Sequence, residues 1–121
     1  MAKDALVVDD TEFSRLTIST FLNLSGFNVD VAENGMVGLK NLSSKKYDLI
    51  FSDVEMPNMN GFEFLKRIKT NNLYKHIPVV MLTSLNDDET VSKLKVLGAT
   101  FYICKPFSRE KMKSALAATG F

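Results

Sequence analysis

Four apolar runs in this chain each end in a polar residue that could take part in chemistry. These residues are Asp9 and Asp10 after 5–8, Asp53 after 49–52, Thr83 after 79–82 and Lys105 after 101–104. The carboxyl ends of parallel strands meet at one edge of an open sheet, and ligands bind in the crevice there. We therefore expect three carboxylates, one hydroxyl and one ammonium group to converge in a shallow site.

These groups suit a divalent cation and a phosphoryl group. Crowded carboxylates raise one another's pKa, and a bound cation relieves their repulsion. Oxygen ligands without a neighbouring His or Cys favour a hard ion, so we expect Mg²⁺, with Mn²⁺ as a substitute. Mg²⁺ uses one or two carboxylates, which leaves one free to form an acyl phosphate. Lys105 and Thr83 would then contact the phosphoryl oxygens.

The chain alternates strand and helix patterns five times. Continuous apolar runs at 5–8, 49–52 and 79–82 are typical of strands buried on both faces, and 100–104 is read as a further strand. Residues 27–31 alternate between apolar and polar, which indicates an edge strand. This alternation predicts a doubly wound α/β fold, (βα)5 and flavodoxin-like, with a five-stranded parallel sheet and helices on both faces.

Helical periodicity and capping residues predict the intervening helices. On the first helix we expect the apolar residues to face the sheet. These residues are Phe13, Leu16, Phe21 and Leu24. Residues that favour the N-cap position precede four of the predicted helices. These residues are Thr11, Asn34, Asp87 or Asp88, and Ser108.

Length and composition describe one ordinary domain covering residues 1–121. Fifteen basic against 14 acidic residues give a net charge of +1, which argues against a dedicated binder of nucleic acid or of a membrane surface. No apolar run approaches the ~20 residues of a membrane span, and no signal peptide is evident. Cys104 is the only cysteine, so an intrachain disulfide is impossible, and we expect a cytoplasmic location.

Five short strings, in order along the chain, carry a resemblance to a known family. They are Val7-Val8-Asp9-Asp10, Ser52-Asp53-Val54-Glu55-Met56-Pro57, Gly61-Phe62-Glu63-Phe64-Leu65, Met81-Leu82-Thr83-Ser84 and Lys105-Pro106-Phe107. Over essentially its whole length the chain resembles the CheY-like receiver domain of bacterial two-component response regulators. The resemblance implies the strand order 2-1-3-4-5.

The resemblance also implies roles for individual residues. Asp53 would be the phosphoacceptor, and Thr83 and Lys105 would contact the phosphoryl group. Asp9 and Asp10 would bind Mg²⁺, together with Asp53. The backbone carbonyl of Glu55 would be a further ligand.

Four more positions match variable or switching positions of the family. Tyr102 stands at the aromatic switch position and would move together with Thr83. The peptide bond before Pro106 is expected to be cis. Glu55 and Leu85 occupy the two positions thought to tune the lifetime of the phosphorylated state.

The function implied is a phosphorylation-activated signalling switch. A sensor histidine kinase would donate the phosphoryl group to Asp53, and the output would be a protein–protein contact. The expected output face consists of the fourth helix, the fifth strand and the last helix. The domain would assist its own phosphorylation and dephosphorylation without being an enzyme in the usual sense, and a stand-alone chemotaxis-type regulator fits best.

Three alternatives remain open. The chain could be the receiver segment of a hybrid kinase or a phosphorelay. An aspartyl-phosphate phosphatase of the haloacid dehalogenase type is disfavoured because its Asp-x-Asp motif is absent and there is no room for a cap domain. A pseudo-receiver that has lost phosphorylation is disfavoured by the complete set of site residues.

Overall fold

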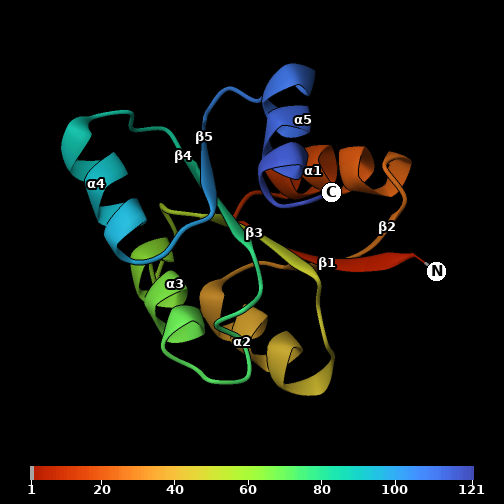
Figure 1. Cartoon of the computed structure of the whole chain (residues 1–121), viewed down its shortest axis with the longest axis horizontal. Helices are drawn as coiled ribbons and strands as arrows, with labels where there is room; N and C mark the ends of the chain where they lie inside the picture. The colour runs from red at the N-terminus through yellow and green to blue at the C-terminus, as the bar shows by residue number, and fades with distance from the viewer. Residues whose placement is uncertain (1) are drawn as a thin grey trace.

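The computed structural model describes residues 2–121 as one parallel sheet flanked by helices (Figure 1). The strands are β1 (Lys3–Val8), β2 (Phe27–Ala32), β3 (Leu49–Asp53), β4 (Val79–Thr83) and β5 (Phe101–Cys104). The helices are α1 (Glu12–Leu24), α2 (Gly35–Ser44), α3 (Gly61–Lys69), α4 (Asp88–Val96) and α5 (Arg109–Ala118). The sheet order is β2-β1-β3-β4-β5, which confirms the predicted topology.

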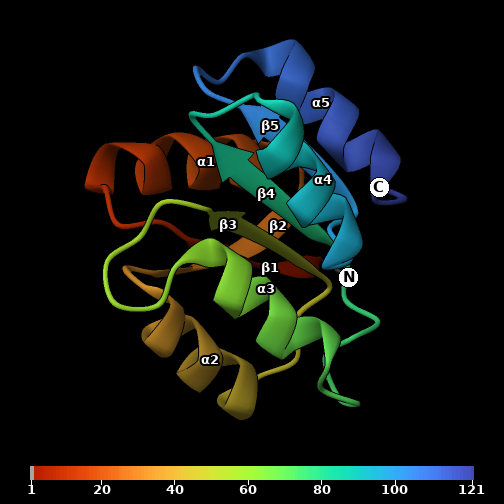
Figure 2. The same ribbon diagram turned by 90° about the vertical axis from the view of Figure 1, so that its left-hand side faces the viewer.

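The sheet separates two hydrophobic cores. Helices α2, α3 and α4 cover one face, and α1 and α5 cover the other (Figure 2). Alternate residues of β1 serve the two cores, since Leu6 packs with the α2–α4 side and Val7 with the α1 and α5 side. Both side chains are completely buried, which explains why the run that forms β1 is apolar without alternation.

Of the four residues predicted for the inner face of α1, only Phe21 packs against a core. Phe13, Leu16 and Leu24 are 79%, 64% and 85% exposed. The buried face is instead formed by Ser14, Ile18 and Leu22, which follow one another at intervals of four residues. Ser14 gives no apolar signal in the sequence, so the periodicity was assigned to the wrong residues. On the edge strand β2, Val31 is exposed although it is one of the apolar residues of the alternating pattern.

Backbone hydrogen bonds continue past the strand ends and fix the chain around the site. The amide of Val54 donates to the carbonyl of Leu82 at 2.8 Å, and the amide of Lys105 donates to the carbonyl of Thr83 at 2.8 Å. Helix α3 begins against this backbone, since the amide of Gly61 donates to Val54 O at 2.8 Å. A side chain at Gly61 would overlap the carbonyl oxygen of Asp53, so glycine is required there.

The predicted N-cap residues stand at the N-cap positions of α1, α2, α4 and α5, and two of them make side-chain capping bonds. Asn34 and Ser108 accept hydrogen bonds from the amides of Val37 and Lys111, and Asp87 occupies the N-cap position of α4. These caps fix where α2, α4 and α5 begin. Within residues 2–121, none of the helices combines the length and the apolar character needed to cross a membrane.

Candidate functional site

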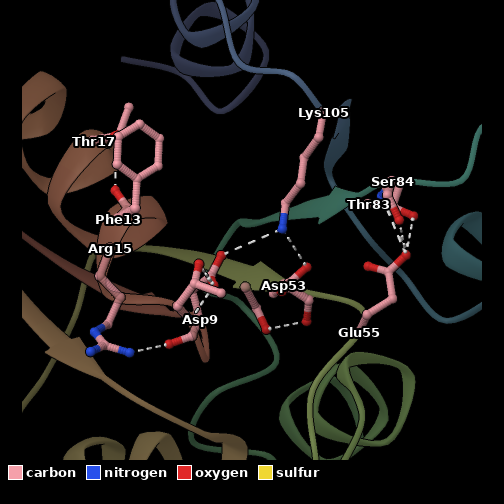
Figure 3. A network of polar contacts seen from close by, with 11 residues as sticks. Asp9, Phe13, Arg15, Thr17, Asp53, Glu55, Thr83, Ser84 and Lys105 are labelled. Atoms are coloured by element: carbon pink, nitrogen blue, oxygen red, sulfur yellow. Dashed lines mark hydrogen bonds and ion pairs between the residues drawn. The ribbon is translucent and has the colours of Figure 1, made fainter.

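The acidic residues of the first and third strand ends lie together (Figure 3). Asp9 follows β1 and is fully buried, and Asp53 ends β3 and is 2% exposed. Asp10 lies beside them and is exposed. One carboxylate oxygen of each residue lies within 4.8 Å of the others. The convergence of the three carboxylates therefore follows from the strand order.

Lys105 reaches into this acidic group from the end of β5, and its ammonium lies between the two buried carboxylates (Figure 3). Its Nζ is 3.3 Å from Asp53 Oδ1 and 3.8 Å from Asp9 Oδ2. The peptide bond between Lys105 and Pro106 is cis, the isomer that the family resemblance implies. One ammonium faces three carboxylates, so the site keeps an excess of negative charge.

The buried carboxylates are incompletely paired. Among the described residues, Asp9 Oδ2 and Asp53 Oδ1 are the buried side-chain oxygens that lack a hydrogen-bond donor. Burial and the charge of Asp9 raise the pKa of Asp53 to about 7, against a smaller lowering by Lys105. A buried carboxylate oxygen without a donor is costly, and a hard cation relieves that cost. The two oxygens, which have an ion pair with Lys105 but no hydrogen bond, and the all-oxygen donor set therefore fit Mg²⁺.

Asp9 is held in place by the first turn of α1. The amide and the hydroxyl of Thr11 each donate to Asp9 Oδ1 at 3.0 Å. Thr11 occupies the N-cap position of α1, as predicted, but its hydroxyl donates to Asp9 and its side chain makes no capping bond to the helix. The guanidinium of Arg15 donates to the carbonyl of Asp9 at 2.8 Å. Sequence reasoning missed Arg15, although a cation one turn into the helix after an acidic pair was a usable signal.

Thr83 ends β4 and is fully buried, and its hydroxyl is bonded to Glu55 and not to Asp53. It donates to Glu55 Oε1 at 3.2 Å, and Ser84 donates to the same oxygen from its hydroxyl at 2.9 Å and its amide at 3.3 Å (Figure 3). The amide of Leu85 donates to Thr83 Oγ1 at 2.9 Å. Ser84 belongs to one of the five strings that carry the family resemblance, but no role was predicted for it.

The hydrogen bonds to Glu55 affect its charge state. Burial acts to raise the pKa of Glu55, but the donors on Ser84 and Thr83 outweigh burial and hold the pKa below its usual range. Glu55 is therefore ionised at neutral pH. Glu55 thus adds a fourth carboxylate to the three of Asp9, Asp10 and Asp53.

Tyr102 lies outside the acidic group, on β5 between α4 and α5 (Figure 1). It is half-buried and packs against the core of the α2–α4 side. A groove of about 690 Å³ runs along this region, and Leu94, Tyr102 and Lys111 are among its lining residues. The expected switch residue is thus separate from the carboxylates, and its hydroxyl donates to Asn86 in the loop after β4 at 3.5 Å.

Comparison with known proteins agrees with this geometry. Residues 5–117 match the family model of the response regulator receiver domain. The chain is 38% identical over 114 residues to a probable chemotaxis protein CheY of Rhizobium etli, covering 93% of this chain and 88% of that protein. It is 33% identical to Protein PilG of Pseudomonas aeruginosa, covering 93% and 84% of the two chains. The solved structure of the chemotaxis response regulator CheY4 of Vibrio cholerae superposes with a TM-score of 0.91 at 34% identity, covering 98% and 99%.

Proposed function

Because this chain belongs to the response regulator receiver domain family, we propose that Asp53 accepts a phosphoryl group from a histidine kinase. As a member of that family the protein is a phosphorylation-activated signalling switch, with a histidine kinase and a downstream protein as its partners. One observation carries the assignment of Asp53. Its Oδ1 is buried, lacks a hydrogen-bond donor and lies 3.3 Å from the ammonium of Lys105.

Mg²⁺ is the proposed cofactor, with Mn²⁺ as a substitute. Asp9, Asp10 and Asp53 would hold it together with the backbone carbonyl of Glu55, and the unpaired oxygens of Asp9 and Asp53 support this ligand set. When bound, the ion neutralises the carboxylates and the charge of the phosphoryl oxygens. Asp10, the exposed member, is the ligand most accessible to solvent.

The residues of the chain would then transfer the phosphoryl group from the kinase to Asp53. A carboxylate oxygen of Asp53 attacks the phosphorus of the kinase phosphohistidine, the new O–P bond forms an acyl phosphate, and the P–N bond breaks. The electron pair of that bond stays on the imidazole nitrogen, which takes its proton from solvent. Lys105 pairs with a phosphoryl oxygen, and Thr83 donates its hydroxyl to another once it is free. In this way the domain assists its own phosphorylation and, with water as the attacking group, its dephosphorylation.

The output is proposed to be a protein contact through α4, β5 and α5, and Tyr102 would change its burial there. The names of the relatives from Rhizobium etli and Vibrio cholerae support a chemotaxis-type regulator. We propose that residues 1–121 form one receiver domain of such a regulator and that it works in the cytoplasm. Glu55 and Leu85 would set the lifetime of the acyl phosphate. No nucleic acid or membrane is needed as a partner.

Acetyl phosphate tests this proposal directly. Wild-type protein is incubated with it in the presence and absence of Mg²⁺, and the intact mass and the release of phosphate are followed. We expect a Mg²⁺-dependent phosphoprotein that persists long enough to be detected. Rapid turnover without a detectable phosphoprotein would support the phosphatase alternative, and no modification at all would support a pseudo-receiver.

A further inference from the structure

The side chain of Glu55 connects two loops of the site. Glu55 stands in the loop after β3, and its Oε1 accepts three hydrogen bonds from Thr83 and Ser84 after β4. We call these three residues the Glu55 clamp (Figure 3). The shortest of the bonds, at 2.9 Å, comes from the hydroxyl of Ser84. The clamp therefore holds the end of β4 to the loop that follows β3.

The clamp occupies the Thr83 hydroxyl. A hydroxyl has one proton to donate, and Thr83 gives it to Glu55 at 3.2 Å. The oxygen of the same hydroxyl accepts from the amide of Leu85 at 2.9 Å. Thr83 thus has no proton to offer to a group on Asp53 while the clamp is closed. Contact between Thr83 and a phosphoryl oxygen requires the Thr83–Glu55 bond to break.

A phosphoryl group on Asp53 would oppose the clamp in two ways. It adds roughly 1.5 to 2 negative charges, and these would repel the ionised carboxylate of Glu55. Its oxygens also compete with Glu55 for the same Thr83 proton. Two anionic acceptors and one donor cannot all be satisfied, so the closed clamp and the phosphorylated state disfavour each other.

We infer that Glu55 is a positioning residue that holds Thr83 and Ser84 away from Asp53 until a phosphoryl group releases them. The inference rests on the proposed function of Asp53. Release of the clamp frees the end of β4 to move, and Tyr102 lies on the neighbouring strand, opposite Met81 in the pairing of β4 with β5. By linkage, a variant with a weakened clamp binds a phosphoryl mimic more tightly, because it is already displaced toward the released state.

Affinity for beryllofluoride, measured with Mg²⁺ present, is the first test. Loss of one net hydrogen bond changes a binding constant by about fivefold. We expect Ser84→Ala to bind beryllofluoride about threefold to fivefold more tightly than wild type, although it removes no charge. Glu55→Ala should bind about tenfold more tightly, and Glu55→Gln, which keeps the acceptor oxygen, should lie between wild type and Glu55→Ala. The matched charge control is Glu63→Gln on α3, which we expect to leave the affinity unchanged.

Amide and side-chain NMR shifts of the metal-free protein are the second test, since they require neither the ion nor the mimic. In Glu55→Ala we expect the Ser84 and Leu85 amides to shift. The Tyr102 ring signals should also shift from their positions in metal-free wild type, because release of the clamp frees the strand that pairs with β5. A merely local structural role would move Ser84 and leave Tyr102 unchanged.

The outcomes separate the clamp from the function on which it rests. Wild-type affinity in Ser84→Ala, together with equal tightening in both Glu55 variants, would show a simple charge effect and overturn the clamp. Unchanged Tyr102 signals in metal-free Glu55→Ala would also overturn it. Failure of wild-type protein to bind beryllofluoride would instead overturn the proposed function, and the metal-free shifts would still decide whether the clamp exists.

Discussion

Two clusters of acidic and basic side chains lie beside the sheet, and they differ in how completely their carboxylates are hydrogen-bonded. The strand-end cluster lies after β1, β3 and β5 and consists of Asp9, Asp53 and Lys105. The edge cluster lies near the beginning of β1 and on β2 and consists of Asp4, Asp30, Lys45 and Tyr47. Each cluster combines two aspartates with one lysine, so the residue types alone do not distinguish them.

In the edge cluster both aspartates have partners. Lys45 Nζ lies 3.3 Å from Asp4 Oδ1 and 3.0 Å from Asp30 Oδ2, and the Tyr47 hydroxyl donates to Asp30 at 2.7 Å. That hydroxyl, with help from Lys45 and against the effect of burial, lowers the pKa of Asp30. The edge cluster therefore ties the loop after α2 to the first two strands, and it needs no ligand.

In the strand-end cluster Lys105 leaves its two carboxylates incompletely paired, and the pKa of Asp53 rises to about 7. Buried polar groups are normally hydrogen-bonded, so two buried oxygens without donors require an explanation. Titratable groups whose pKa values are strongly shifted are concentrated at functional sites. The presence or absence of hydrogen-bond donors to the carboxylates, more than the number of carboxylates, therefore distinguishes the candidate site from a structural ion pair.

The largest expected effect on stability is a gain on neutralising Asp53. In metal-free protein at pH 8, Asp53→Asn should raise the free energy of unfolding by on the order of 2–4 kcal/mol, because burial and Asp9 oppose the charge of Asp53. Urea unfolding of both proteins without metal measures it. The edge cluster supplies the matched variant, Asp30→Asn, which should not gain stability. A less stable Asp53→Asn would contradict the account of the strand-end cluster.

The same shift predicts a pH dependence. An Asp carboxyl in the unfolded chain titrates near 3.8, whereas the pKa of folded Asp53 is about 7. Between these values the folded protein binds more protons, so its stability falls as the pH rises from about 4 to about 7. We expect the difference in stability between Asp53→Asn and wild type to grow over this range. Unfolding curves at several pH values measure it, and a constant difference would contradict the raised pKa.

Binding of Mg²⁺ should offset the loss of stability that the charged strand-end carboxylates cause, and it should leave the edge cluster unaffected. At pH 8, Mg²⁺ at about 100 times its dissociation constant should stabilise wild-type protein by roughly 2–3 kcal/mol. Asp10→Asn should lose most of this gain, because it lacks one of the proposed ligands, whereas Asp30→Asn should keep it. Thermal unfolding with and without Mg²⁺ is the measurement. Equal stabilisation of Asp10→Asn and wild type would remove Asp10 from the ligand set.

The smallest effect is expected at the edge cluster. The lowered pKa of Asp30 means that its contribution to stability is present above an ordinary Asp pKa and is lost as the pH falls through the folded value. Its side chain is 41% exposed, so solvent screening limits the loss in Asp30→Asn to below about 1 kcal/mol at pH 7. Urea unfolding at pH 7 and at acidic pH would detect it. A loss as large as the gain in Asp53→Asn would erase the distinction between the two clusters.

Much of the fold could be predicted from the sequence, because buried parallel strands read as continuous apolar runs and several helix caps are marked by polar residues. The strand order needed the family resemblance, since alternation of strands and helices does not fix it. The inner face of α1 could not be predicted because Ser14 is small and polar while Phe13 and Leu16 are exposed. Ile18 and Leu22 are apolar and fully buried, so packing against the sheet selects among the apolar residues of α1.

The site was predictable to the extent that strand ends determine it. Asp9, Asp53 and Lys105 converge because parallel strands end at one edge. The contact of Glu55 with Ser84 depends on the conformation of two loops, for which the sequence holds no periodic signal. The pairing of Lys45 with Asp30 was unpredictable for a similar reason, because Lys45 is placed by the end of α2.

Phosphorylation by acetyl phosphate, with the modified residue located by peptide mass spectrometry, tests the central claim most directly. Three proteins are compared in the presence of Mg²⁺: wild type, Asp53→Asn and Asp30→Asn. The account predicts one phosphoryl group on Asp53 in wild type and in Asp30→Asn, dependent on Mg²⁺, and none in Asp53→Asn. Labelling of Asp53→Asn at the wild-type level, or modification of wild type at any other residue, would contradict it.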